Sequence, residues 1–141
     1  MGSVETNFKE YFYSKINIIK NKGIKCNIKS GDSSLEYNSS NLLVLPSVHD
    51  SFGLVVPEAL ISGLPVLVSS NAGSYELINH QNKGEGFLAG DMQDFCKKID
   101  KIYQNKNFYK NNSKNLSNES MSLDWNCIYK SFNKKLSNEL L

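Results

Sequence analysis

Two carboxylates flank a glycine-containing loop near the middle of this chain. Asp50 and Glu58 lie eight positions apart, and Ser51, Phe52 and Gly53 follow Asp50 directly. Carboxylates are good hydrogen-bond acceptors for sugar hydroxyl groups, and a glycine lets the backbone approach a ligand closely. A ligand with a phosphate between two polyols would satisfy both carboxylates, and a nucleotide sugar has this shape.

The basic residues restrict how such a ligand could be held. All 16 of them are lysine, and the formal net charge is only +2. Bidentate arginine clamps are therefore excluded, and a phosphate would be bound by lysine or by backbone amides. A helix expected over 55–61 would point its unpaired amides at the preceding loop, which favours an anion site there. The small net charge also argues against a nucleic-acid-binding protein.

Two apolar runs must position this loop. Residues 42–45 end at Pro46, and residues 65–69 follow Gly63. Such continuous apolar runs are typical of strands buried on both faces of a parallel sheet. Pro57 is tolerated in the intervening helix because it falls in the first turn. Ligands of open α/β sheets bind beyond the carboxyl ends of strands, which is where the loop 47–54 is expected.

The rest of the chain continues an alternation of strands and helices, which predicts an α/β fold with a Rossmann-like parallel sheet flanked by helices. We interpret residues 1–141 as a single partial domain that could bury a core, since 40% of the residues are hydrophobic. Further predictions are a flexible or artificial start over 1–6, a helix over 7–22, a strand over 23–28, a turn over 30–34, a helical turn over 35–40, a helix over 74–79 capped by Ser74, a strand over 86–89, and C-terminal helices over 91–141.

Cysteine spacing and hydropathy bear on the compartment. Cys26, Cys96 and Cys127 are scattered, and no pair has zinc or redox spacing. We read them as ordinary core thiols of a reducing compartment, which predicts a cytoplasmic protein. No apolar run reaches the roughly 20 residues of a membrane span.

The segment from Pro46 to Leu60, the following Ser62–Val66, and then Gly73 and Glu76 resemble a known family. They look like the donor-binding C-terminal half of retaining glycosyltransferases of the glycosyltransferase-B fold, above all family four. That family includes many enzymes of lipopolysaccharide, capsule and O-antigen assembly. Its signature is two glutamates separated by seven residues around a Phe-Gly loop. The resemblance extends from about Asn7 to Phe132.

The resemblance implies an activity and a role for each site residue. It implies transfer of a hexose from a nucleotide sugar to a hydroxyl acceptor, with retained anomeric configuration and without a metal or other cofactor. Asp50 stands at the catalytic position, where the first glutamate contacts the donor sugar, and Glu58 would hold the ribose hydroxyls. The donor base would lie near Lys29. The amides of Phe52, Gly53, Leu54 and Val55 would face the diphosphate and sugar, and Ser51 beside them is a further expected substrate-binding residue.

Two departures from the family pattern affect these expectations. Asp50 replaces a glutamate, and its reach is shorter by about 1.3 Å. By the resemblance, we also expect the chain to be without the N-terminal acceptor domain and the first two strands of the donor domain, and therefore to be inactive alone. A strand over 23–28 would then have no neighbour. It could move beside 42–45, pair with a partner chain by self-association, or be loosely held, and we expect one of the first two.

Structural interpretations of the same residues remain open. Glu58 could cap its own helix, and Asp50 could be a turn residue bonded to its own backbone. Gly73 and Glu76 could form a packing and turn feature. His49 adjoins the site but lacks a metal-ligand partner.

Two alternatives concern the whole chain. The lysine-rich stretch 97–114 reads best as a solvated face, with peripheral contact to the inner face of a membrane as a lesser alternative. The alternative to an enzyme is a non-catalytic remnant or a nucleotide-binding module without turnover.

Overall fold

The computed structural model describes residues 9–29, 34–78 and 82–139. It consists of two compact units, residues 1–35 and 36–141, and each is described by itself. The first unit contains helix α1 (Lys9–Asn21), where the sequence predicts a helix. Gly23 follows α1 with a φ of 79°.

The predicted strand over 23–28 is wrong. Residues 24–29 have irregular backbone, and the strand at 43–45 pairs with another segment instead. Apolar and polar side chains alternate over 23–28, as they do in a strand, which is why the sequence predicts one. A strand also needs a neighbour for its N–H and C=O groups, and the described residues supply none.

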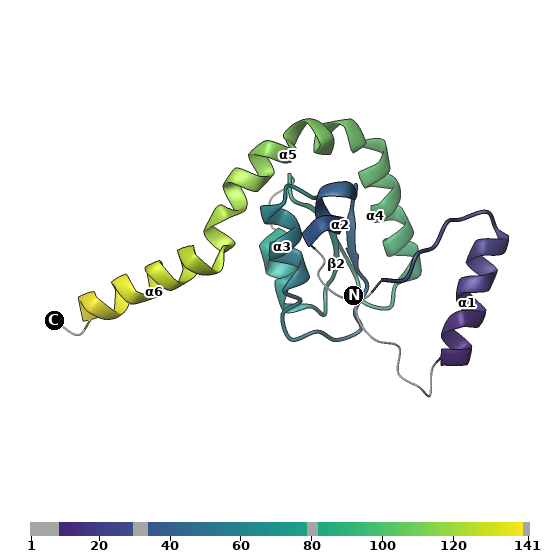
Figure 1. The fold of residues 1–141 in the computed structure, drawn as a ribbon, viewed down its shortest axis with the longest axis horizontal. Helices are drawn as coiled ribbons and strands as arrows, with labels where there is room; N and C mark the ends of the chain where they lie inside the picture. The colour runs from purple at the N-terminus through teal and green to yellow at the C-terminus, as the bar shows by residue number, and fades with distance from the viewer. Residues whose placement is uncertain (1–8, 30–33, 79–81, 140–141) are drawn as a thin grey trace. The chain divides into compact units, whose positions relative to one another are not determined.

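The second unit is built on a three-stranded parallel sheet with strand order β1-β2-β3, which confirms the predicted α/β fold (Figure 1). Leu43 of β1 is in register with Val66 of β2, which is in register with Gly84 of β3. Its elements are α2 (Ser34–Ser39, which begins at the unit boundary), β1 (Leu43–Leu45), α3 (Val55–Ile61), β2 (Val66–Ser69), the 3-10 helix η2 (Gly73–Ile78), β3 (Gly84–Phe87), α4 (Met92–Gln104), α5 (Lys106–Ser120), the 3-10 turn η3 (Met121–Leu123) and α6 (Trp125–Glu139).

Alternate side chains of the strands pack into two different cores. Val66 and Val68 of β2 face α3 and η2, where Val56 and Leu60 are fully buried. Leu67 points to the other face and packs with residues of α4 and α5. The sheet is therefore covered on both faces, as expected for parallel strands.

Two predicted features of the strands need correction. β1 is only half-buried, because it is the edge strand of the described sheet, whereas central β2 is buried at all four positions. The third strand begins at Gly84, two residues before the prediction. Gly84 passes close to the carbonyl oxygen of Val66, so a side chain there would collide with β2. The sheet therefore requires a residue without a side chain at this position. The same glycine weakens the strand pattern in the sequence, so the prediction began the strand too late.

The last third of the unit is helical, as predicted. Asp91 caps α4, since its carboxylate accepts hydrogen bonds from the N–H groups of Gln93 and Asp94 at 2.9 Å. Helix α5 runs past the amino ends of the strands: its Tyr109 joins the core on the α4 face and its Leu116 joins the core on the α3 face. No helix in the described ranges is long and apolar enough to cross a membrane.

Candidate functional site

The loop between β1 and α3 lies at the carboxyl end of β1, as the sequence predicts. Backbone hydrogen bonds tie it to the segment that follows β2. The Asp50 N–H donates to the Asn71 carbonyl at 3.2 Å, and the Gly73 N–H donates to the Asp50 carbonyl at 3.2 Å. The Ser74 N–H donates to the Phe52 carbonyl at 2.7 Å. The loop therefore has a defined backbone path although it contains no helix or strand.

Gly53 is required by this path in two ways. Its φ is +79°, a region that other residues adopt only with strain. A Cβ atom at this position would also lie 2.6 Å from Leu45 Cδ2 and 3.1 Å from Ser74 Oγ. The glycine therefore lets the loop fold back over the end of β1, immediately before α3.

Backbone amides are free where the sequence predicts an anion site. Within residues 34–78 and 82–139, no acceptor receives a hydrogen bond from the N–H of Gly53, Leu54 or Val55. Leu54, at the start of α3, has no side-chain cap. The Phe52 N–H differs, since it donates to Asp50 Oδ1 at 3.1 Å. Three of the four amides expected to face a diphosphate therefore have no protein partner in the described structure.

The Asp50 carboxylate closes a turn onto its own backbone. Its bond to the Phe52 N–H spans two residues, which is the geometry of an Asx-turn. This contact agrees with the structural alternative for Asp50. The other carboxylate oxygen, Oδ2, accepts no hydrogen bond from the described residues. Asp50 can therefore hold the turn with one oxygen while the other receives a hydroxyl group.

The Glu58 carboxylate is held by a residue from another element. The Tyr37 hydroxyl, on α2, donates to Glu58 Oε2 at 2.7 Å. Glu58 lies in the first turn of α3 and is exposed. In the described structure it accepts no bond from the amides of its own helix, so the capping alternative is not observed as a hydrogen bond. Its Oε1 remains available to a ligand.

The loop also carries exposed apolar side chains. Phe52 is 42% exposed and Leu54 is 49% exposed, while Ser51 is exposed and Val55 is half-buried. Exposed apolar groups beside free amides give the loop both an apolar and a hydrogen-bonding surface. This combination suits a ligand with a charged centre and less polar ends.

The remaining predicted residues fall into two groups. Gly73 lies against the loop, and a side chain there would collide with the Ser51 carbonyl oxygen, in agreement with its packing interpretation. His49 and Glu76 are exposed. Lys29 belongs to the first unit, so its placement at the donor base stays a prediction.

Sequence reasoning missed Tyr37 and misassigned Ser74. Tyr37 lies 21 positions before Glu58, and no pattern in the sequence links the two. Ser74, predicted as a helix cap, lies inside η2, and its buried hydroxyl has no hydrogen-bond partner among the described residues. Its position beneath Gly53 depends on the loop path, which the sequence does not reveal.

Residues 5–119 match the family described as "Glycosyl transferases group 1". This is most of the chain. The chain belongs to this family. The chain thus has the family's sequence pattern together with the fold and the loop described above.

Curated relatives match this chain over a fraction of their own length. It is 30% identical over 110 residues to an uncharacterized glycosyltransferase of Methanocaldococcus jannaschii, covering 75% of this chain and 28% of that protein. It is 31% identical over 101 residues to the sulfoquinovosyl transferase SQD2 of Arabidopsis thaliana, covering 70% of this chain and 20% of that protein. The chain therefore spans about a quarter of the length of these relatives.

Solved structures share the fold. HepE of Anabaena in complex with UDP aligns with a TM-score of 0.73 at 19% identity, over 95% of this chain and 38% of that one. Sucrose-phosphate synthase of Thermosynechococcus elongatus aligns with a TM-score of 0.73 at 21% identity, over 91% of this chain and 34% of that one. Both likenesses support the glycosyltransferase-B fold predicted from the sequence.

Proposed function

We propose that this chain is the donor-binding part of a retaining glycosyltransferase that transfers a hexose from a nucleotide sugar to a hydroxyl acceptor. The observation that carries the proposal is that three free amides, Gly53 to Val55, lie in one loop and helix start between two carboxylates, Asp50 and Glu58, that each keep one oxygen available. Membership of the group 1 family supports glycosyl transfer. The likeness to HepE, solved with UDP, supports a nucleoside diphosphate as the common part of the donor.

Each group has a role that follows from its chemistry. The amides of Gly53, Leu54 and Val55 would donate to the diphosphate, aided by the positive end of α3. The Glu58 carboxylate would accept hydrogen bonds from the two ribose hydroxyls, in an orientation held by Tyr37. Asp50 would contact the donor sugar with Oδ2, and no metal is needed for this arrangement. The base would lie near Lys29.

The biological setting completes the proposal. We place the reaction in the synthesis of surface polysaccharide or lipopolysaccharide, as the sequence resemblance implies. A cytoplasmic location is supported by the three free cysteines. The prediction that they are core thiols is wrong for Cys96 and Cys127, which are exposed. Turnover would require an acceptor domain, in agreement with the small share of the relatives that the chain spans.

Calorimetric titration with UDP, GDP and ADP tests the donor site. We expect one nucleotide to bind saturably and Glu58→Gln to weaken it at least tenfold, because a charged acceptor is replaced by a neutral amide of the same shape in which a donor NH2 group takes the place of one acceptor oxygen. Asp100→Asn, which neutralises an exposed carboxylate on α4, serves as the matched control. A folded chain that binds none of the three nucleotides would contradict the proposal.

The Asx-turn favours a second candidate, a nucleotide-binding module without turnover, because the turn accounts for Asp50 structurally. The contribution of the sugar to binding affinity distinguishes this candidate from the enzyme. For the matching nucleotide, the enzyme proposal expects the nucleotide sugar to bind more tightly than the bare diphosphate, and Asp50→Asn to remove that difference. The second candidate expects no difference for Asp50→Asn to remove.

A further inference from the structure

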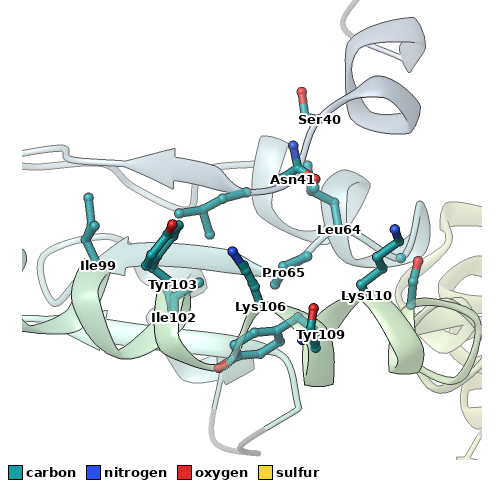
Figure 2. A pocket seen from close by; sticks show the side chains of 14 residues that line it. Ser40, Asn41, Leu64, Pro65, Ile99, Ile102, Tyr103, Lys106, Tyr109 and Lys110 are labelled. Atoms are coloured by element: carbon teal, nitrogen blue, oxygen red, sulfur yellow. The ribbon is translucent and has the colours of Figure 1, made fainter.

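A second polar site lies at the opposite end of the sheet from the donor loop. It is a cavity of about 720 Å³ beside Leu42, which precedes β1, and Pro65, which precedes β2. Helices α4 and α5 form its other wall (Figure 2). Because the amino and carboxyl ends of parallel strands lie at opposite edges of a sheet, this cavity is separate from the loop 47–54.

The two walls of the cavity differ in chemistry. Its apolar part comes from Leu64, Pro65, Ile99 and Ile102, and its polar part includes Asn41 and the lysines of α5. Figure 2 shows Lys106 and Lys110 directed from α5 toward the side of the cavity that carries Asn41. The cavity therefore places two ammonium groups beside apolar lining residues.

The two lysines have no acidic partner in the described structure. Lys106 and Lys110 are one helical turn apart, and like charges at this spacing repel each other. The first acidic residue of α5 is Glu119, which accepts a hydrogen bond from Asn82 instead. Lys106 Nζ lies 4.5 Å from the centroid of the Tyr103 ring, a cation–π contact that supplies no negative charge to pair with the ammonium group.

The lysines of the neighbouring helix α4 differ from those of α5, because they have an acidic partner. Its lysines Lys98 and Lys101 both pair with Glu85 of β3, at 3.2 Å and 2.6 Å. Glu85 is therefore already shared between two cations and is not available to α5. No residue that lines the cavity is acidic. The charge pattern of the cavity is complementary to an anion with an apolar body.

We propose that this cavity binds an anionic membrane phospholipid, with the phosphate between Lys106 and Lys110 and the upper part of an acyl chain against Ile99 and Pro65. Charge complementarity, together with the adjoining apolar lining, favours a phospholipid as the ligand. A free phosphate would use the lysines alone, whereas a phospholipid uses both walls. The site anchors the chain at an anionic membrane surface through a few residues of α4 and α5, independently of the donor loop.

Vesicle binding by the 141-residue chain tests the proposal. Sedimentation with phosphatidylglycerol–phosphatidylcholine vesicles is compared with pure phosphatidylcholine vesicles and with titration of inorganic phosphate. We expect binding to the anionic vesicles alone. Lys106→Gln/Lys110→Gln weakens it about 25-fold at low salt, since each lysine near an anionic surface contributes roughly fivefold. Lys97→Gln/Lys130→Gln, the same charge change at exposed sites outside the cavity, has a smaller effect.

A fluorescent probe locates the bound lipid. Tyr103 is 67% exposed and lines the cavity, so Tyr103→Trp in a Trp125→Phe background places a single tryptophan there. We expect acyl-brominated phosphatidylglycerol to quench it, and the lysine double variant to abolish the quenching. Equal losses in both lysine pairs, unquenched tryptophan, or inorganic phosphate binding as tightly as the vesicles would each overturn the proposal. Circular dichroism establishes that every variant is folded.

Discussion

The candidate donor loop and the lysine-lined cavity lie at opposite ends of the same sheet and offer a ligand different groups. At the donor loop, beside the carboxyl ends of the strands, most of the free hydrogen-bonding groups are backbone amides. At the cavity, beside the amino ends, the charged groups are side chains of α5. The loop before α3 leaves the amides of Gly53 to Val55 free and keeps its shape through bonds to residues 71–74. The cavity at the amino ends of the strands would instead bind a ligand through Lys106 and Lys110, whose positions depend on the packing of the 15-residue helix α5.

This difference determines how each region responds to substitution. A loop defined by backbone geometry is sensitive to changes in φ and to added atoms, and insensitive to many side-chain replacements. A site made of side chains on a helix tolerates many changes at its surface but depends on how the helix is seated. The two edges can therefore be disturbed separately.

The largest effect on stability is expected from Gly63→Ala at the amino edge. Gly63 has a φ of +77°, and a Cβ there would lie 2.6 Å from the Ser113 carbonyl oxygen of α5. Backbone strain and overpacking together are expected to cost about 3 kcal/mol of unfolding free energy. Urea unfolding measures the loss. The change tests whether α5 is seated against the end of α3, as the Ser117 hydroxyl bond to the Ile61 carbonyl also indicates.

The control for this change is Gly90→Ala. Gly90 has a φ of +82° but no atom within 4 Å of an added Cβ, so only the strain remains. We expect a loss of about 1 kcal/mol. Equal losses at both positions would show that contact with α5 contributes nothing.

Gly53→Ala is expected to act mainly on the ligand at the carboxyl edge. The added Cβ would meet the end of the Leu45 side chain, which can rotate away, so the cost in stability is about 2 kcal/mol. The loop must shift to accommodate it, which moves the free amides. Nucleotide affinity should fall at least tenfold by calorimetry, at temperatures where the variant is folded. Unchanged nucleotide affinity would show that this loop is not part of the donor site.

Tyr37→Phe should have a smaller effect at the same edge. It removes the hydroxyl that donates to Glu58 at 2.7 Å and leaves the buried ring in place. A net hydrogen bond of this kind contributes about 1 kcal/mol, so we expect roughly a threefold to tenfold loss of nucleotide affinity. In a Glu58→Gln background the same change should have less effect. Additive losses would show that Tyr37 does not act through Glu58.

The smallest effect is a dependence of stability on alkaline pH. Burial, with a lesser contribution from the Glu85 carboxylate, raises the pKa of Tyr109 above its usual 10.0. The unfolded chain therefore loses this proton at lower pH than the folded chain. The contribution to stability is complete below about pH 10 and declines as the pH rises through the folded pKa. Tyr109→Phe should make thermal stability fall less steeply there, whereas Tyr103→Phe, at an exposed tyrosine, should not.

Much of the fold follows from local pattern. The apolar runs ending at Pro46 and beginning at Pro65 predicted two neighbouring strands, and the helix over 55–61 was predicted at its observed bounds. Both succeed because burial on a sheet and a turn at Gly63 are encoded within a few residues. The strand predicted over 23–28 failed because strand formation depends on a neighbour, which local pattern cannot supply.

The site divides in the same way. Residue type and spacing placed Asp50, Gly53 and Glu58 around one loop at the end of β1, and the structure has them there. Tyr37 was not predicted, because its contact with Glu58 joins separate helices. The Asx-turn at Asp50 was one of two interpretations, and the observed backbone path makes one carboxylate oxygen structural.

The sequence by itself determined the family, the parallel α/β architecture and the loop that carries the candidate donor site, because these depend on short motifs and hydrophobic patterning. The tertiary structure alone decided which amides remain free, which oxygen of each carboxylate is occupied, and where the lysines of α5 lie. Those properties depend on contacts between distant segments, such as Tyr37 with Glu58 and Gly63 with Ser113. Such contacts form only when the elements pack, so no local pattern encodes them.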